Sequence, residues 1–371
     1  MDAEGKQLLK QVRSLIRSAR QIAARGVNTL QVMTNFEIGR LIIEHEQKGR
    51  KRAEYGKQIL QELSRELSSE FGKGFSKSNL EYMRRFFLEY GERIPRITQT
   101  LSGQLPERVY KNQILSKELS SWKMVSSDSK TPFGLSWSQY VFLLGIADGK
   151  ERQFYEIETA GNNWSLRELK RQYDSGLYER LALSRDKKKI KELSAIGQLV
   201  EKPEDLLKEP YVLEFLGLDE KAVYSEYDLE SAIIDKLEHF LLELGKGFLF
   251  EARQKSFTFD SDHFFVDLVF YNRILRCYVV IDLKIGKLTH QDLGQMQMYV
   301  NYFDRYVRMK DEKPTIGVIL CKMKNDALVK LTLPKNTNVY PARYQLYLPS
   351  KEELKRKLLE WTKEEELDDD R

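Results

Sequence analysis

The sequence predicts a multidomain protein with two fold classes, an all-α N-terminal part and an α/β C-terminal part. Apolar residues recur at helical spacing over most of the first 200 residues. From about residue 229 the pattern changes to a helix, three strand-like runs, a second helix and a further strand. This order is typical of a mixed sheet flanked by helices. A chain of 371 residues is long enough for two such domains.

Three amphipathic helices are expected near the N-terminus. Their apolar positions predict helices over residues 7–24, 28–46 and 57–71. Pro, Gly and Ser then interrupt the helical pattern, which predicts an irregular connection over about 91–132. Further along the chain, Ser136 and Ser165 stand where a serine can cap a new helix.

A glycine-bearing turn separates the third helix from the next one. Gly72 and Gly74 fit a helix stop and a tight turn, and the Ser76 hydroxyl can accept from free backbone N–H groups where a new helix starts. This layout is typical of a helix-turn-helix, whose second helix contacts DNA. The alternative is a helical hairpin whose basic residues are only solvated. The candidate DNA contacts are Lys77, Asn79, Arg84 and Arg85.

The pattern divides the chain into four parts. We expect a helical, DNA-binding-like domain over 1–200, a linker over 201–228, an α/β domain over 229–350, and a C-terminal helix with an acidic tail over 351–371. The net charge of +5 permits nucleic-acid binding without requiring it.

The composition argues against several classes of protein. No apolar run is long enough to span a bilayer, and the N-terminus lacks the apolar core of a signal peptide. Cys277 and Cys321 lie in apolar strand-like runs and fit buried thiols of a reducing compartment, so we expect a cytoplasmic protein. The 4 histidines show no ligand spacing and no CxxC motif is present, which argues against a zinc site.

Three charged residues interrupt the apolar strands of the α/β domain: Asp267, Asp282 and Lys284. Charges in a buried strand are costly unless they are paired or bind metal. Strand residues alternate faces, so Asp282 and Lys284 lie on one face. If residues 272–273 close a two-residue hairpin, Asp267 lies opposite Tyr278, roughly 13 Å along the strand from Asp282. One metal ion cannot span that gap, so the strands would need a bulge or a strong twist here.

Two carboxylates and a lysine are the groups that phosphodiester hydrolysis needs. Carboxylate oxygens hold a hard divalent metal and leave positions for water and phosphate. A neighbouring lysine stabilises the developing negative charge and positions the attacking water. The alternative is an ordinary Asp–Lys ion pair at the end of a strand, and the residue types alone do not decide between the two.

The order of these motifs resembles the PD-(D/E)XK nuclease superfamily. Asp267 takes the place of the first acidic residue, and the run from Asp282 to Lys284 takes that of the (D/E)XK motif. The proline of the superfamily's name is absent, because Val266 precedes Asp267.

The resemblance also implies roles for residues on two helices. Gln295 and Tyr299 match the Q-X-X-X-Y pair of the exonuclease-like members, in which Gln295 would orient water or phosphate and Tyr299 would support it. Glu230, on the leading helix, is the candidate for a further metal ligand beside the two aspartates, and Glu238 is its substitute.

The resemblance extends over nearly the whole chain. A set of longer segments is similar to the YhcG-like (DUF1016) family: GRLIIEHEQKGRKRAEYGKQIL, FGKGFSKSNLEYMRRFF, NNWSLRELKRQ, FLLELGKGFLFEARQ, VDLVFYNRILRCYVVIDLK, GQMQMYVNYFD and TIGVILCK. This similarity implies a helical, winged-helix-like N-terminal domain and a restriction-endonuclease-like C-terminal nuclease domain. The family more often has Glu where Asp282 stands, which stays within the D/E alternative.

The resemblance therefore implies a Mg²⁺- or Mn²⁺-dependent nuclease that hydrolyses DNA phosphodiester bonds in a defence, restriction-associated or DNA-repair process. DNA is the expected partner, with a homo-oligomer or other DNA-processing proteins as further candidates and no membrane. One alternative is a non-catalytic DNA-binding or assembly subunit that keeps the nuclease scaffold. Another is an RNA-targeting nuclease, although no aromatic RNA-binding strand motif is present.

Overall fold

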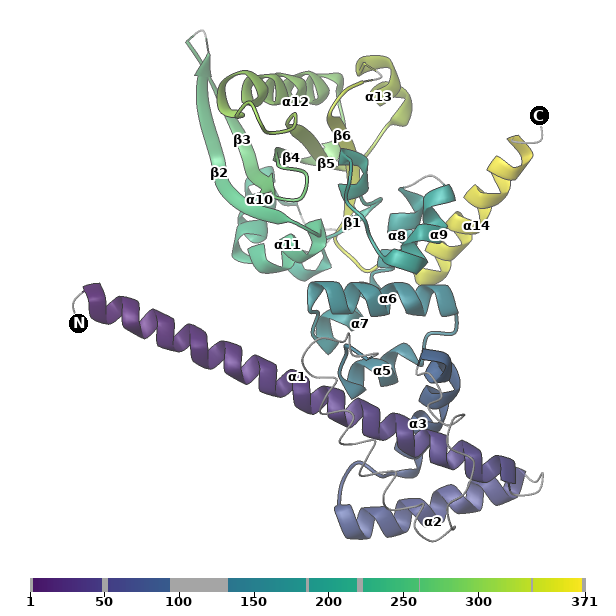
Figure 1. The fold of residues 1–371 in the computed structure, drawn as a ribbon. Coiled ribbons are helices and arrows are strands. Elements are labelled where there is room, and N and C mark those ends of the chain that lie inside the picture. Colours follow the sequence, from purple (N-terminus) through teal and green to yellow (C-terminus); the bar gives the residue numbers. More distant parts are fainter. Residues whose placement is uncertain are drawn as a thin grey trace. The chain divides into compact units, whose positions relative to one another are not determined.

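The computed structural model describes residues 3–48, 53–93, 133–184, 187–218, 223–259, 261–334 and 336–368. The chain forms two compact units, Met1–Arg152 and Gln153–Arg371, drawn in Figure 1. This division comes earlier in the chain than the expected linker at 201–228, and those expected domain limits stay a prediction. Most of the irregular connection expected over about 91–132 lies outside the described residues.

Helices make up the first unit wherever residues 3–48, 53–93 and 133–152 are described. They are α1 (Ala3–Lys48), α2 (Ala53–Phe71), α3 (Lys77–Tyr90), a 3₁₀ turn (Gly91–Arg93), α5 (Trp137–Leu143) and the start of α6 (Gly149–Asn162). The prediction of two helices over 7–24 and 28–46 is wrong, because α1 continues through Gly26 without a break. An interior glycine weakens a helix but does not have to end it. These ranges show no strand, so a wing is not seen in them.

The turn after α2 has the predicted conformation. Gly72 and Gly74 adopt φ angles of 80° and 117°, which side chains disfavour. The Ser76 hydroxyl accepts from the Asn79 N–H at 3.3 Å and caps α3. The helix–turn–helix arrangement of the sequence analysis is therefore confirmed as local structure.

An aromatic core joins α1, α3 and α5. Phe36, Phe86, Phe133 and Tyr140 are buried and pack edge to face or tilted against one another. The helices α1 and α3 approach most closely at Gly39, where an added Cβ would lie 2.1 Å from the Met83 carbonyl oxygen. Only glycine fits between these two backbones.

We predict that Gly39→Ala separates α1 from α3, because the Cβ meets backbone rather than a movable side chain. The expected loss of stability is about 1–3 kcal/mol, seen as a lower Tm of the unit in circular dichroism. Gly26→Ala is the matched control, since its Cβ would have nothing within 4 Å and alanine favours a helix. Equal Tm values for the two variants would contradict the close packing at Gly39.

The second unit is built on a six-stranded mixed sheet in the order β1-β6-β5-β4-β3-β2. The strands are β1 (Tyr211–Val212), β2 (Phe248–Phe259), β3 (Asp262–Asn272), β4 (Cys277–Lys287), β5 (Ile316–Met323) and β6 (Val339–Gln345). Strands β2, β3 and β4 pair antiparallel, whereas β4, β5, β6 and β1 pair parallel. The two-residue strand β1 was not expected from the sequence, because it is too short to show a period.

Helices cover both faces of this sheet, as predicted (Figure 1). Helix α12 (His290–Tyr302) packs on one face, and α10 (Glu226–Asp235) and α11 (Leu237–Leu244) pack on the other. The expected single leading helix is interrupted at Lys236, which leaves helical geometry with φ −115° and ψ 29°. The remaining helices are α7 (Leu166–Asp174), α8 (Leu177–Leu183), α9 (Lys187–Ile196), α13 (Asp326–Thr332) and α14 (Lys351–Asp368), with short turns at Pro203–Leu206, Glu214–Leu216 and Phe303–Val307. None of the helices in the described ranges is long and apolar enough to cross a membrane.

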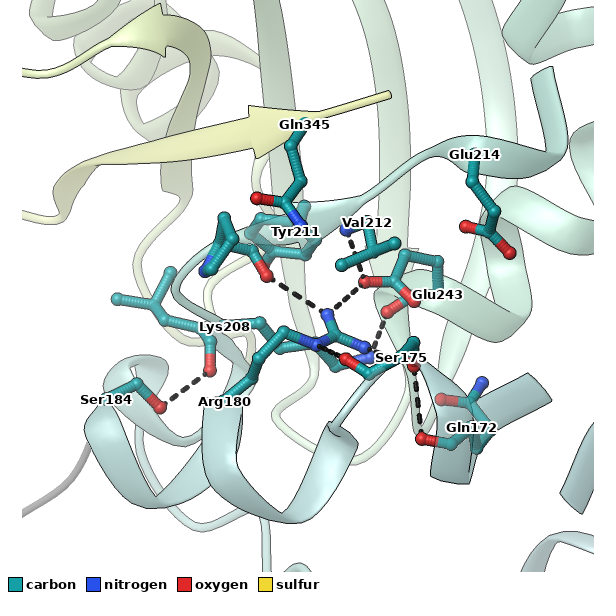
Figure 2. Close-up of polar contacts among 12 residues, drawn as sticks. Gln172, Ser175, Arg180, Ser184, Lys208, Tyr211, Val212, Glu214, Glu243 and Gln345 are labelled. Atoms are coloured by element: carbon teal, nitrogen blue, oxygen red, sulfur yellow. Dashed lines mark hydrogen bonds and ion pairs between the residues drawn. The ribbon is translucent and has the colours of Figure 1, made fainter. Parts of the chain in front are cut away.

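A buried ion cluster joins α8 to α11 and β1 (Figure 2). Arg180 and Glu243 are fully buried and lie 2.6 Å apart. Arg180 also donates to the Ser175 hydroxyl at 2.9 Å, and Glu243 accepts from the Val212 N–H at 2.9 Å. Lys208, also buried, donates to the backbone carbonyl of Glu243. Each charge therefore has a partner, as buried charges require.

The charges of this cluster shift the pKa of its members. Burial opposes ionisation of Glu243, but the cations of Arg180, Lys208 and Arg171 outweigh it and lower its pKa to about 2. Burial lowers the pKa of Lys208 to about 8, although Glu243 opposes that shift. Glu243 is thus a carboxylate at every physiological pH.

We predict that Glu243→Gln destabilises the second unit by about 3–5 kcal/mol, because it leaves buried cations without their counter-charge. Chemical denaturation of the full chain would show the loss as an earlier transition. The matched control is Glu353→Gln, which breaks an exposed pair with Lys357 on α14 and should leave the transition in place. A transition that is unchanged in Glu243→Gln would contradict this assignment.

Candidate active site

The three strand charges of the sequence analysis come together at the β3–β4 hairpin. The turn has four residues, 273–276, rather than the expected two-residue turn at 272–273, so that expectation was wrong. The Asn272 side chain causes the difference, because its oxygen accepts from the N–H groups of Ile274 and Leu275, both at 3.1 Å.

The longer turn closes the gap between the two aspartates. It pairs Leu268 with Ile281, the last pair that the two strands share, and Asp267 and Asp282 are the residues next to that pair. The Leu283 N–H, next to Asp282, donates to Asp267 Oδ2 at 2.8 Å. The pairing of Asp267 with Tyr278, from which the gap of roughly 13 Å followed, does not occur, since Tyr278 pairs with Tyr271.

The alternation of side chains along β3 slips by one residue at Asp267. Val266 and Val269 both belong to the core on the α12 side of the sheet, whereas Leu268 and Phe270 belong to the core on the α10 side. The expected local irregularity is therefore present, in addition to the shift of register. Across from Asp267, Gln254 of β2 has φ 46°, an uncommon conformation for a residue other than glycine.

Asp282 is a buried carboxyl with incomplete partners. Only 3% of it is exposed, and the Lys284 Nζ lies 2.8 Å from its Oδ2. That contact is an ion pair without good hydrogen-bond geometry, and Oδ2 has no hydrogen-bond donor. Burial, and then the negative charge of Asp267, raise the pKa of Asp282 to about 7 even though Lys284 opposes the shift.

Lys284 is held between two acids. Besides Asp282 it lies 3.5 Å from Glu226 of α10. Burial disfavours its charge, but the carboxylates of Asp282, Glu226 and Asp267 outweigh burial and raise its pKa above the ordinary value. Lys284 is therefore a cation at neutral pH and not a free base.

Asp267 has both carboxylate oxygens engaged. Its Oδ2 accepts from the Leu283 N–H, and its Oδ1 accepts from the Gln254 amide at 3.0 Å. Burial raises the pKa of Asp267, and the donors and Lys284 reduce this shift without cancelling it. Both aspartates thus lie where negative charge is disfavoured, which is a setting that a cation would relieve.

Glu230, the expected additional acid, is buried on α10 and points toward β2. One oxygen accepts from Arg253 and the other from Gln254, whose amide also reaches Asp267. Glu230 is thus linked to the aspartates through Gln254. The substitute candidate, Glu238, is exposed on α11.

Gln295 and Tyr299 of α12 lie next to β3. The Gln295 amide donates to the Tyr299 hydroxyl at 2.5 Å, and that hydroxyl donates to the Phe265 carbonyl at 2.8 Å. Burial and the negative charge of Asp282 raise the pKa of Tyr299 to about 12. Tyr299 is therefore a neutral donor that ties the helix to the strand of Asp267, and its spacing of four residues lets Gln295 reach it.

The candidate DNA contacts on α3 mostly have partners within their own unit. Asn79 accepts from the Trp137 indole at 2.8 Å and donates to the Gly74 carbonyl. Arg84 forms an ion pair with Glu46 at 2.8 Å, and Arg85 donates to the Leu144 carbonyl at 2.7 Å. Lys77 is partly exposed. The DNA-binding role of these four residues stays a prediction.

The donor set of the site suits a hard cation. Asp282 Oδ2 is buried and accepts no hydrogen bond. Burial and the neighbouring Asp267 carboxylate raise the pKa of Asp282. Among the described residues, no three His, Cys, Asp or Glu side chains are close enough to form a metal cluster as they stand. Two neighbouring carboxylates therefore fit a metal, which would share Asp282 Oδ2 with the Lys284 ammonium at 2.8 Å, and a third ligand from Glu230 would require its present hydrogen bonds to break. A cavity of about 200 Å³ between β6 and α14 contains none of these residues.

Three contributors to the site were missed in the sequence. Gln254 and Arg253 lie on β2, which carried no recognisable motif, and Glu226 sits at the start of α10. Gln254 stands opposite Asp267 only because of the strand register. Glu226 is four residues before Glu230, one helical turn away, and this spacing was the one available signal.

Comparison with known families defines the class of protein. The family described as "YhcG PDDEXK nuclease domain" matches residues 204–359, and the one described as "DUF1016 N-terminal domain" matches residues 11–180. The site geometry lies within the first match. The second unit thus carries a PD-(D/E)XK nuclease domain.

The chain belongs to the YhcG-like (DUF1016) family. It is 40% identical over 341 residues to a protein of Escherichia coli (strain K12) described as "Putative nuclease YhcG", covering 92% of this chain and 90% of that protein. Among solved structures, a repair endonuclease from Pyrococcus abyssi aligns with 34% of this chain and 50% of that chain, at 19% identity and a TM-score of 0.23. The predicted family is confirmed.

We predict that Asp282→Asn changes how the stability of metal-free protein depends on pH. In the wild type the pKa of Asp282 is raised from 3.8 to about 7, so the folded state binds this proton more tightly than the unfolded state does. Stability conferred by the protonated form is therefore lost as the pH rises through that window, by up to about 4 kcal/mol. Asparagine is neutral throughout, so the Tm difference between variant and wild type should grow from about pH 4 to about pH 7 and level off above that.

The complementary measurement adds Mg²⁺ at the higher pH. The wild type should gain Tm, because a ligand that binds only the folded state stabilises it. The Asn variant should gain much less. Parallel pH profiles for the two proteins would contradict the raised pKa.

Proposed function

We propose that this protein is a Mg²⁺- or Mn²⁺-dependent nuclease that hydrolyses DNA phosphodiester bonds at the β3–β4 hairpin. The observation that supports it most is the cross-strand placement of Asp267 and Asp282 beside Lys284. Two carboxylates beside a half-buried cation, in a domain of the PD-(D/E)XK class, fit phosphodiester hydrolysis better than a structural ion pair.

In this proposal Asp267 and Asp282 hold the metal, which would supply Lewis-acid stabilisation of the phosphate. The Lys284 ammonium stabilises the negative charge that develops on the phosphate oxygens, since it stays charged at neutral pH. Gln295 orients water or phosphate, and Tyr299 positions Gln295 through their hydrogen bond. Glu230 is the third acidic residue of the site in this proposal.

The helices of the first unit are proposed to contact DNA. Lys77 and the N-terminus of α3 supply positive charge toward phosphate, as helix N-termini can. Arg84 and Arg85 would have to exchange their partners, Glu46 and the Leu144 carbonyl, for phosphates. We further propose that such an activity serves defence, restriction-associated or DNA-repair processes.

A non-catalytic DNA-binding or assembly subunit is the second candidate. The contact of Lys284 with Glu226 and that of Arg253 with Glu230 favour it, because these pairs neutralise the site internally. In such a subunit the charged residues would hold the hairpin against α10 and no metal would be needed.

The decisive experiment measures cleavage by purified full-length protein with Mg²⁺ or Mn²⁺ on single-stranded, duplex and branched DNA. Asp282→Ala and Lys284→Ala should each lower the cleavage rate by at least about 100-fold, while the Kd for DNA changes little. Lys287→Ala is the matched control, since it removes an exposed lysine of the same strand and should retain the rate.

Three outcomes are distinguishable. Loss of cleavage in both variants with intact binding supports the nuclease. A wild type that binds DNA but cuts neither DNA nor RNA with either metal supports the assembly subunit. Cleavage of RNA but not of DNA would show that the substrate is RNA rather than DNA.

A further inference from the structure

Gln254 forms a bridge between two acids of the site. Its amide nitrogen donates to Glu230 Oε2 and to Asp267 Oδ1. An amide nitrogen carries two hydrogens, so one group can serve both carboxylates at once. The strand register explains the reach: Arg253 pairs with Leu268 and Lys255 with Val266, which leaves Gln254 directly across from Asp267.

The backbone at Gln254 is adapted to this position. Its φ of 46° lies in the left-handed region, which costs a residue with a side chain roughly 1–2 kcal/mol. The alternation of β2 also slips between Ala252 and Phe257, because both pack on the α12 side of the sheet although they are five positions apart. Unfavourable backbone geometry of this kind concentrates at functional sites.

Glu230 is fixed from two directions by neighbouring residues of β2. Arg253 donates to its Oε1 and also to the Ser231 hydroxyl at 3.0 Å, and the Arg253 guanidinium lies 5.3 Å from the centre of the Tyr227 ring. Glu230 is 2% exposed, so its carboxylate has little freedom to turn. Its two oxygens are thus occupied by Arg253 and Gln254.

Asp267 is fixed in the same manner. One oxygen accepts from Gln254 and the other from the Leu283 N–H of the neighbouring strand. Donors on both oxygens hold the plane of the carboxylate, and such outer partners of a metal-binding group commonly set its orientation. Removing Gln254 would free one half of the Asp267 carboxylate and one oxygen of Glu230.

We propose that Gln254 is a positioning residue that links Glu230 to Asp267, and that Glu230 acts through Gln254 rather than as a third metal ligand. The inference rests on the proposed function, since it concerns the same site. It predicts that Glu230 is needed as a hydrogen-bond acceptor and not for its charge. An amide oxygen at position 230 can still accept from Gln254, whereas a direct metal ligand would need the carboxylate.

The test compares Gln254→Leu, Glu230→Gln and Glu230→Ala with the wild type. Single-turnover cleavage of DNA gives the rate and the DNA affinity, and titration calorimetry without DNA gives the Kd for Mn²⁺. Gln254→Leu should lower the rate or the metal affinity by about 10–100-fold with DNA affinity unchanged. Glu230→Ala should resemble it, and Glu230→Gln should lose less of the rate and of the Mn²⁺ affinity than Glu230→Ala does, because its one amide oxygen can still accept from Gln254.

Two controls separate positioning from a loss of folding. Ser256→Ala changes an exposed residue of the same strand and should leave rate, metal affinity and Tm unchanged. The double variant Glu230→Ala/Gln254→Leu should be no worse than Gln254→Leu alone, because residues that act through one another are not additive.

Each other outcome overturns a defined claim. If Glu230→Gln loses Mn²⁺ binding as fully as Glu230→Ala, the charge of Glu230 is required and it is a direct ligand, which overturns the inference. A Gln254→Leu variant equal to the wild type also overturns it. A wild type that neither binds Mn²⁺ nor cleaves nucleic acid overturns the proposed function itself, and the inference with it.

Discussion

The side chain of Asn272 sets the register on which the candidate site depends. It is fully buried, accepts from the N–H groups of Ile274 and Leu275, and donates to the Lys246 carbonyl at 2.9 Å. This closes a four-residue turn, and the turn decides which residues of β3 and β4 face each other. A shift of register moves every side chain of a strand relative to its neighbour. The Asn272 amide group, at the end of the hairpin, therefore decides whether Asp267 and Asp282 lie close together, although both are several residues away from the turn.

Much of the second unit could be predicted from the sequence, because its signals are strong and local. Apolar runs rich in β-branched residues marked β3, β4 and β5, and the helical period marked the segments of α10, α11 and α12. Two features lacked such a signal. Strand β1 has two residues, and the break at Lys236 occurs at neither a Gly nor a Pro. In the first unit, two helices were predicted over 7–24 and 28–46, but α1 continues through Gly26 between them.

The site was predictable in its residue types and faces but not in its geometry. The charges in the apolar strands marked Asp267, Asp282 and Lys284, and alternation placed them on one face, yet the distance between the aspartates followed from the wrong turn. The length of the turn depends on the hydrogen bonds of the Asn272 side chain. The sequence alone is compatible with either a two-residue or a four-residue turn. The role of Gln254 could not be predicted from the sequence for a different reason. Its contribution depends on a left-handed φ and on a neighbour 13 positions away in sequence, neither of which leaves a local pattern.

The buried pair of Arg180 and Glu243 bears on how the nuclease domain could be separated from the rest of the chain. Arg180 lies outside the sheet segment, on α8, and is the last residue of the DUF1016 N-terminal match, whereas Glu243 lies within the nuclease match. A fragment starting at the first strand or at the leading helix would keep Glu243 and lose its cation, and would enclose an uncompensated charge in its own interior. The smallest piece that carries the sheet with its charges balanced therefore includes α7 and α8. An exchange of N-terminal domains at residue 204 would have to preserve this pair, because its two residues lie in different family matches.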